Sequence, residues 1–248
     1  MLRKTAVILA LIILTVGLVN AQKAPKDWAE WSDKDVKKVL DNSGWGQVQT
    51  DTVTSELFFK QANRRVARTS EDANNQAPSI SYHIRFMSAK PVREALVRKI
   101  MIDQKVGLTD PLKAFINRPT DQWIVVAVAF DSATGRILGP AVQAFNSANL
   151  GVLRNNVYLE RGDGKRIFIE QYHIPGAEGF GAQFTFPRMV DGKPFITADS
   201  GTVRFHAEIP SDDVPDPNST GSTGTTNVLK LDMKFKVAEM MYDGKLEY

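Results

Sequence analysis

The chain has 248 residues, of which 43% are hydrophobic and 24% are charged, with no Cys and a formal net charge of +3. This is the composition of an ordinary globular protein, and it excludes collagen-like, coiled-coil and wholly disordered chains. The absence of Cys excludes disulfide bridges, thiolate zinc sites, a Cys nucleophile and a lipoprotein anchor.

The first 21 residues have the pattern of a signal peptide. Arg3 and Lys4 precede an apolar stretch of 14 residues, Ala6 to Val19, and Val19-Asn20-Ala21 has the small residues of a cleavage site. A membrane span needs about 20 residues, so a cleaved leader is favoured over an uncleaved anchor. Cleavage leaves 227 residues (248 − 21) with a formal charge of +1 (3 − 2). We therefore expect an exported protein, periplasmic or secreted, whose charge does not indicate nucleic-acid binding.

Cleavage after Ala21 gives a measurable expectation, because it makes Gln22 the first residue of the mature protein. The intact mass of exported material should equal that of residues 22–248. A mass that retains Met1 to Ala21 would contradict the assignment.

Three helices are predicted, at residues 32–42, 89–105 and 110–117. Ser32 and Asp35 have the spacing of a capping box at the start of the first. Ser88 is predicted to cap the second helix, and Pro91 lies in its first turn, where no backbone N–H is needed. Asp110 begins the third helix, and Pro119 ends it.

Most of the remaining chain is predicted to form strands, at residues 52–60, 80–86, 122–130, 137–145, 152–160, 166–173, 183–187, 202–209 and 228–237. The tripeptide Asp-Gly-Lys occurs at 163–165, 191–193 and 243–245, and Asp-Gly favours hairpin turns. Between residues 229 and 237, apolar residues alternate with Lys and Asp, which is typical of a strand with one buried face. The fold class expected is α+β: a mainly antiparallel sheet or sandwich with about three helices packed on one side.

Residues 22–248 are expected to form a single domain. Residues 211–227 are rich in Ser, Thr, Gly, Pro and Asp and too polar to bury, so they predict a flexible insertion between two strands.

Three segments also resemble a known group of sequences. They are WSDKDVKKVLDNSGW (31–45), YHIRFMSAKPVREA (82–95) and FKVAEMMYDGKLEY (235–248). They are similar to segments of uncharacterised exported proteins from acidobacteria-type soil bacteria. The resemblance implies export and one co-folding unit, and it implies no activity.

A run of basic residues is the strongest electrostatic feature of the sequence. Its members are Arg64, Arg65, Arg68, Arg85, Lys90, Arg93, Arg98 and Lys99. If the strand and helix that carry them pack together, several share a surface suited to an acidic envelope component or another protein. An ordinary solvated surface is the simpler explanation of the same run and is favoured.

The sequence contains no motif that identifies catalysis or cofactor binding. His83, His173 and His206 lie on separate predicted strands, and none has a second His at the spacing of a local metal site. The segment Gly176 to Gly181 is rich in glycine, but no helix is predicted to follow it, so it indicates a long connection between strands and not a dinucleotide-binding turn. We predict no catalytic, cofactor-binding or metal-binding residues.

These observations favour an exported, non-catalytic protein of the cell envelope that binds or supports an unidentified partner. The alternative is a secreted hydrolase whose active site the sequence does not locate.

Overall fold

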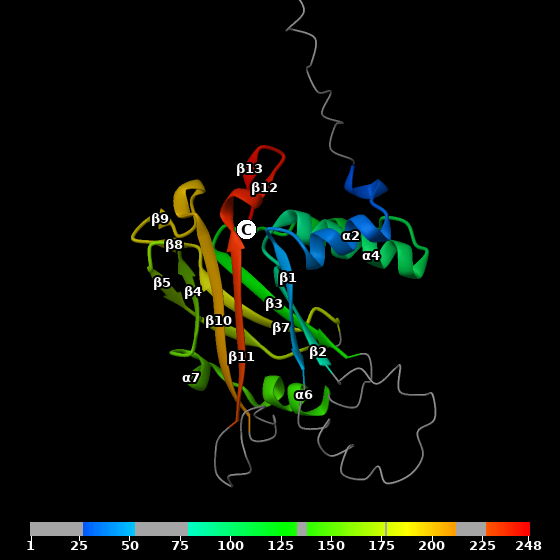
Figure 1. Cartoon of the computed structure of the whole chain (residues 1–248). Helices are drawn as coiled ribbons and strands as arrows, with labels where there is room; N and C mark the ends of the chain where they lie inside the picture. Colours follow the sequence, from blue (N-terminus) through cyan, green and yellow to red (C-terminus); the bar gives the residue numbers. More distant parts are fainter. Residues whose placement is uncertain (1–26, 53–78, 133–137, 177, 212–226) are drawn as a thin grey trace, which may run out of the picture.

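The protein is described by a computed structural model, covering residues 27–52, 79–132, 138–176, 178–211 and 227–248. Two mainly antiparallel sheets dominate it (Figure 1), as the predicted α+β fold requires. The first has the order β1-β2-β3-β7-β6 and the second β11-β10-β4-β5. Their strands are β1 (Gly46–Thr52), β2 (Ser79–Phe86), β3 (Trp123–Asp131), β7 (Ala182–Pro187), β6 (Gln171–His173), β11 (Asn227–Lys236), β10 (Thr202–Ser211), β4 (Val157–Arg161) and β5 (Arg166–Phe168).

The hydrophobic core joins the two sheets through aromatic contacts. The ring of Phe86 on β2 meets that of Phe235 on β11 edge-on, with 5.0 Å between centroids, and Phe184 on β7 meets Phe205 on β10 at 5.5 Å. Alternate residues of β2 are buried, because successive side chains of a strand point to opposite faces. The core of the described residues is therefore continuous from one sheet to the other.

The three predicted helices are confirmed as α2 (Asp33–Asp41), α4 (Lys90–Gln104) and α5 (Asp110–Ile116). Helix α4 contacts both others, and Figure 1 shows α2 and α4 side by side at the right of the sheets. The predicted capping box between Ser32 and Asp35 is present. Ser88 does not cap α4 as predicted: Ala89 is the N-cap residue, and the Ser88 hydroxyl accepts a hydrogen bond from Val125 N–H instead. No helix among the described residues is long and apolar enough to cross a membrane.

The strand predicted at 137–145 is wrong, because residues 138–147 form the helix α6 (Leu138–Ser147). Its buried residues, Ala141, Ala144 and Phe145, have the spacing of one helix face, and Pro140 lies in the first turn, where a missing N–H costs nothing. The strand predicted at 152–160 is shorter than expected, since the helix α7 (Leu150–Leu153) precedes β4.

The predicted strand at 166–173 is divided between the two sheets. Its first part is β5 and its second part is β6, and the bonds Ile169 N–H to Val157 C=O and Glu170 N–H to Thr185 C=O mark the crossing. At the opposite edge, Gln47 and Gln49 of β1 hydrogen-bond to the backbone of β11 at Lys234, Lys230 and Asp232. The sheets are therefore connected at both edges.

All three predicted Asp-Gly turns are confirmed. They close the hairpins β4–β5, β8 (Met189–Val190)–β9 (Lys193–Pro194) and β12 (Met241–Tyr242)–β13 (Lys245–Leu246). Both turn residues have positive φ at 191–192 and 243–244, as a type I′ turn requires, whereas at 163–164 only Gly164 does.

Three predicted segments lie wholly or almost wholly outside the described residues. These are the signal peptide at 1–21, the strand at 52–60, of which only Thr52 is described, and residues 212–226 of the insertion.

Candidate functional site

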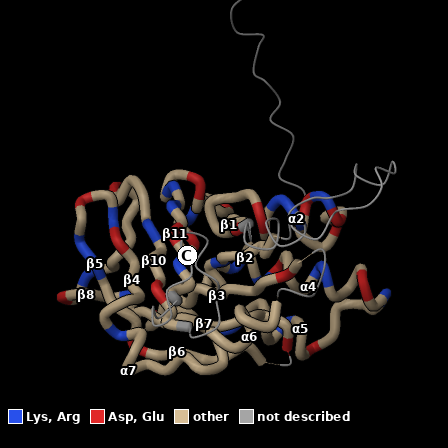
Figure 2. Tube along the Cα trace, turned by 60° about the horizontal axis from the view of Figure 1, so that its bottom comes forward, with Lys and Arg blue, Asp and Glu red and all other residues tan. Residues whose placement is uncertain are grey.

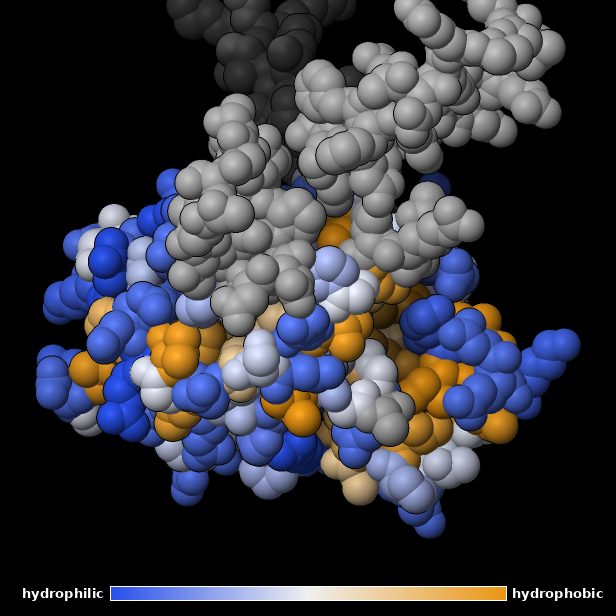
Figure 3. All heavy atoms as spheres, turned by 90° about the horizontal axis from the view of Figure 1, so that it is seen from below, coloured by the Kyte–Doolittle hydropathy of each residue, from blue (hydrophilic) through white to orange (hydrophobic). Residues whose placement is uncertain are grey.

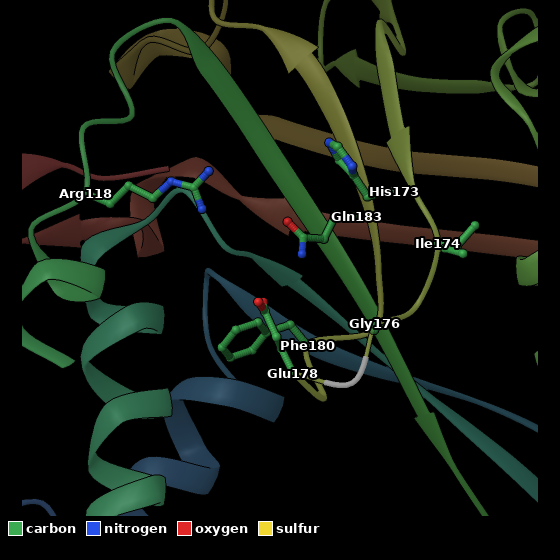
Figure 4. A pocket seen from close by; sticks show the side chains of 8 residues that line it. Arg118, His173, Ile174, Gly176, Glu178, Phe180 and Gln183 are labelled. Carbon is green, nitrogen blue, oxygen red and sulfur yellow. The ribbon is translucent and has the colours of Figure 1, made fainter. Parts of the chain in front are cut away.

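A polar pocket of about 340 Å³ lies beside the outer face of the first sheet (Figure 4). Its floor comes from β6 and β7, and its walls come from the segment that connects them and from the residue Arg118, which follows α5. The lining residues are Arg118, His173, Ile174, Gly176, Glu178, Phe180, Gly181 and Gln183.

Two contacts fix the walls of this pocket. The Phe180 ring stacks on Phe115 of α5, with 5.2 Å between centroids and 8° between planes. Gly181 has φ +82°, and a Cβ there would lie 2.1 Å from the carbonyl oxygen of Val128 on β3. Only glycine permits that close approach, so the connecting segment is held against both the helix and the sheet.

Three of the polar side chains of the pocket point toward a common space. His173 and Gln183 are paired across β6 and β7 and so share one face of the sheet. Figure 4 shows the polar ends of Arg118, Gln183 and Glu178 directed toward the same region, with His173 beside it. Within the described part of the chain these four side chains make no hydrogen bond or ion pair, so their bonding capacity is open to solvent or a ligand.

Arg93 does not belong to an exposed basic surface, contrary to the prediction. This guanidinium is 5% exposed and donates hydrogen bonds to the carbonyl oxygens of Ile116, Met87 and Ser88. Arg93 joins the end of α5 to the turn before α4, and it is not available to a partner. The sequence could not reveal this, because the burial arises from α5 packing over α4.

The remaining predicted basic residues divide into three groups. Arg85 and Arg98 are partly buried and donate to backbone carbonyls, of Leu40 and Trp31 respectively. On α4, Lys90 is partly exposed and Lys99 is exposed, and they pair with Glu94 and Asp103 respectively. Arg64, Arg65 and Arg68 lie outside the described residues. Figure 2 shows basic and acidic residues interleaved along the described trace, in keeping with this mutual pairing.

His83 lies between two carboxylates. Its Nδ1 is 2.9 Å from Asp41 at the end of α2, and its Nε2 is 3.0 Å from Asp131 of β3. The hydrogen bond to Asp41 raises the pKa of His83 and outweighs the opposing effect of burial. Burial opposes ionisation of Asp41, but hydrogen bonds from His83 and Arg85 hold its pKa below the usual value.

This cluster predicts a pH-dependent stability. A raised pKa means that the folded state binds the His83 proton more tightly than the unfolded state, whose pKa is near 6.5. The stability that the His83 proton adds to the folded state is fully present below pH 6.5. It is lost as the pH rises through the raised pKa of His83. Urea unfolding at pH 6 and pH 8 should show a larger loss of stability for the wild type than for His83→Gln. Equal losses in the two proteins would contradict the raised pKa of His83.

The other two histidines occupy different surroundings. His206 is stacked on Tyr158 of β4 with 4.7 Å between ring centroids, and it faces Asp232 and Glu208. His173 lines the pocket. Among the residues that the structure describes, no group of three or more His, Asp or Glu side chains could hold a metal ion.

Hydrophobic residues form several patches on the visible part of the lower face. Figure 3, which views the molecule from the side of α6 and α7, shows them in patches separated by hydrophilic residues. Val142 of α6 and Val152 of α7 are among the exposed apolar side chains. Exposed apolar side chains are common on protein surfaces, and these identify no partner by themselves.

The sequence indicated the connecting segment that forms one wall of the pocket, but it did not indicate Arg118, which forms another. The segment Gly176 to Gly181 was expected to connect two strands, and it connects β6 to β7. Arg118 was not singled out, because its only local signal is its position between α5 and Pro119. Arg118 lines the pocket because of where α5 ends relative to β6, which the sequence does not reveal.

Comparison with known proteins adds little. No family model matches the chain, and no curated protein matches it. A solved structure of a DUF4426 family protein from Pseudomonas aeruginosa is similar over 71% of this chain and 98% of its own, with 10% identity and a TM-score of 0.30. Such a distant similarity carries no argument about function.

Proposed function

We propose that this is an exported, non-catalytic binding protein of the cell envelope, and that its binding site is the pocket at Arg118. The signal-peptide pattern of residues 1–21 supports export. The resemblance of three segments to exported proteins supports the same location. The pocket gives the protein a site for a small polar ligand.

One observation carries the proposal: polar groups without partners gather in the pocket. Several charged side chains elsewhere on the described surface pair with one another. On the second sheet, for example, Glu160 pairs with Arg166 and Arg204, and Arg204 also pairs with Asp232. In the pocket, Arg118, Glu178 and Gln183 have no such partners among the described residues. Convergent unpaired polar groups in a concavity are typical of a ligand site.

The chemistry of the lining favours binding over hydrolysis. The described lining residues include no Ser, Thr or Asp, so His173 has no hydroxyl nucleophile beside it and Glu178 has no second carboxylate. A hydrolase that uses another part of the chain stays the alternative.

Two measurements test the proposal. Fractionation of the source cells should place the mature protein outside the cytoplasm. Backbone amide NMR spectra of residues 22–248, recorded with glycine, acetate, glucose and inorganic phosphate in turn, should show shifts clustered at residues 173–183 for at least one probe. Retention in the cytoplasm would contradict export, and an unchanged pocket with all four probes would contradict the binding site.

A further inference from the structure

The pocket is lined by one positively charged and one negatively charged side chain that do not form an ion pair. Arg118 and Glu178 both line it, and no ion pair joins them to each other or to another described side chain. By contrast, Arg166 and Glu160 on β5 and β4 form an ion pair. Figure 4 shows both charged ends directed toward the space between them, with the Gln183 carboxamide alongside.

We propose that the pocket binds a small zwitterion, a molecule that carries one carboxylate and one primary ammonium group. The inference rests on the proposed binding function and specifies its ligand. The carboxylate is bound by the Arg118 guanidinium, whose planar N–H groups match a carboxylate in a bidentate arrangement. The ammonium is bound by the Glu178 carboxylate.

Electrostatics distinguishes this ligand from simpler ions. An inorganic phosphate held by Arg118 lies near the negative charge of Glu178, and a simple amine held by Glu178 lies near the positive charge of Arg118. Each of these ions leaves one charge of the pocket unmatched, and such a mismatch costs affinity and gives specificity. A zwitterion matches both charges.

Size and the remaining polar groups agree with a small ligand. A volume of about 340 Å³ is at the lower end for ligand pockets, which span roughly 300–1,000 Å³. Gln183 provides both a donor and an acceptor, and His173 lies across the strand pair from it. The Phe180 ring, fixed by its stacking on Phe115, forms an apolar wall for the carbon skeleton of the ligand.

Calorimetry with four probes tests the proposal. L-Alanine carries both groups, propionate lacks the ammonium, ethylammonium lacks the carboxylate, and inorganic phosphate is a multiply charged anion. Wild-type protein is compared with Arg118→Gln and Glu178→Gln. The control variants are Lys113→Gln and Asp110→Asn, which change one charge each at an exposed ion pair on α5 outside the pocket lining.

L-Alanine should bind the wild type and both controls more tightly than the other probes. Each pocket variant should weaken its binding by about tenfold or more, since each loses a charged hydrogen bond. Glu178→Gln should also bind propionate more tightly than the wild type does, because it removes the like charge.

The failures of the two proposals can be told apart. If phosphate or propionate binds as tightly as L-alanine, and Glu178→Gln changes nothing, the zwitterion is wrong while a binding pocket at Arg118 survives. If none of the four probes binds, the proposal of a zwitterionic ligand is also overturned. The NMR titration then decides separately whether the pocket binds any ligand.

Discussion

Replacing Phe235 by Ala should lower the free energy of unfolding by about 3–5 kcal/mol, in the range for losing a buried aromatic side chain. Phe235 is completely buried on β11, and its ring packs edge-on against Phe86 of the other sheet. The substitution opens a cavity between the two sheets. Urea unfolding monitored by circular dichroism measures the loss.

The matched controls lie on the opposite face of the same strand. Lys234 and Lys236 are exposed, and Lys234→Gln or Lys236→Gln should change stability by less than about 0.5 kcal/mol. Since a shift of one residue exchanges the faces of a strand, lysine variants as damaging as Phe235→Ala would show that the register of β10 and β11 is wrong.

Replacing Arg93 by Met should cost about 2–4 kcal/mol, because the substitution keeps the apolar stem and removes every donor. Three carbonyl groups then lose their partner: Ile116 at the end of α5, and Met87 and Ser88 before α4. Thermal or urea unfolding measures the effect.

Lys99→Gln is the control for Arg93→Met, since Lys99 lies on the same helix with its side chain half exposed and pairs with Asp103. It should cost less than about 0.5 kcal/mol. If Arg93→Met is no more damaging than this control, the three carbonyl groups do not depend on the guanidinium, and α5 is not held to α4 as described.

Local patterns in the sequence predicted the parts of the fold that local physics decides. The Ser32–Asp35 capping box is a contact within one turn, and each Asp-Gly turn depends on two adjacent residues. The strand at 228–237 was predicted because its alternation directly reflects its buried face: Leu229, Leu231 and Phe235 are buried, and the lysines between them are exposed.

The errors arose where tertiary packing decides the structure. Leu138–Ser147 is as apolar as a strand, and only the spacing of its buried residues, visible once the core is known, identifies a helix. The division of 166–173 between two sheets and the burial of Arg93 depend on contacts with distant segments. The pocket also combines distant positions, since Arg118 is more than fifty residues from His173 and Gln183.

A crystal structure of residues 22–248 soaked with L-alanine tests the central claim most directly. The account predicts electron density for the ligand in the pocket, with its carboxylate within about 3 Å of the Arg118 guanidinium and its ammonium at a similar distance from Glu178. A pocket that contains only water under saturating L-alanine, or an alanine bound elsewhere on the molecule, would contradict it.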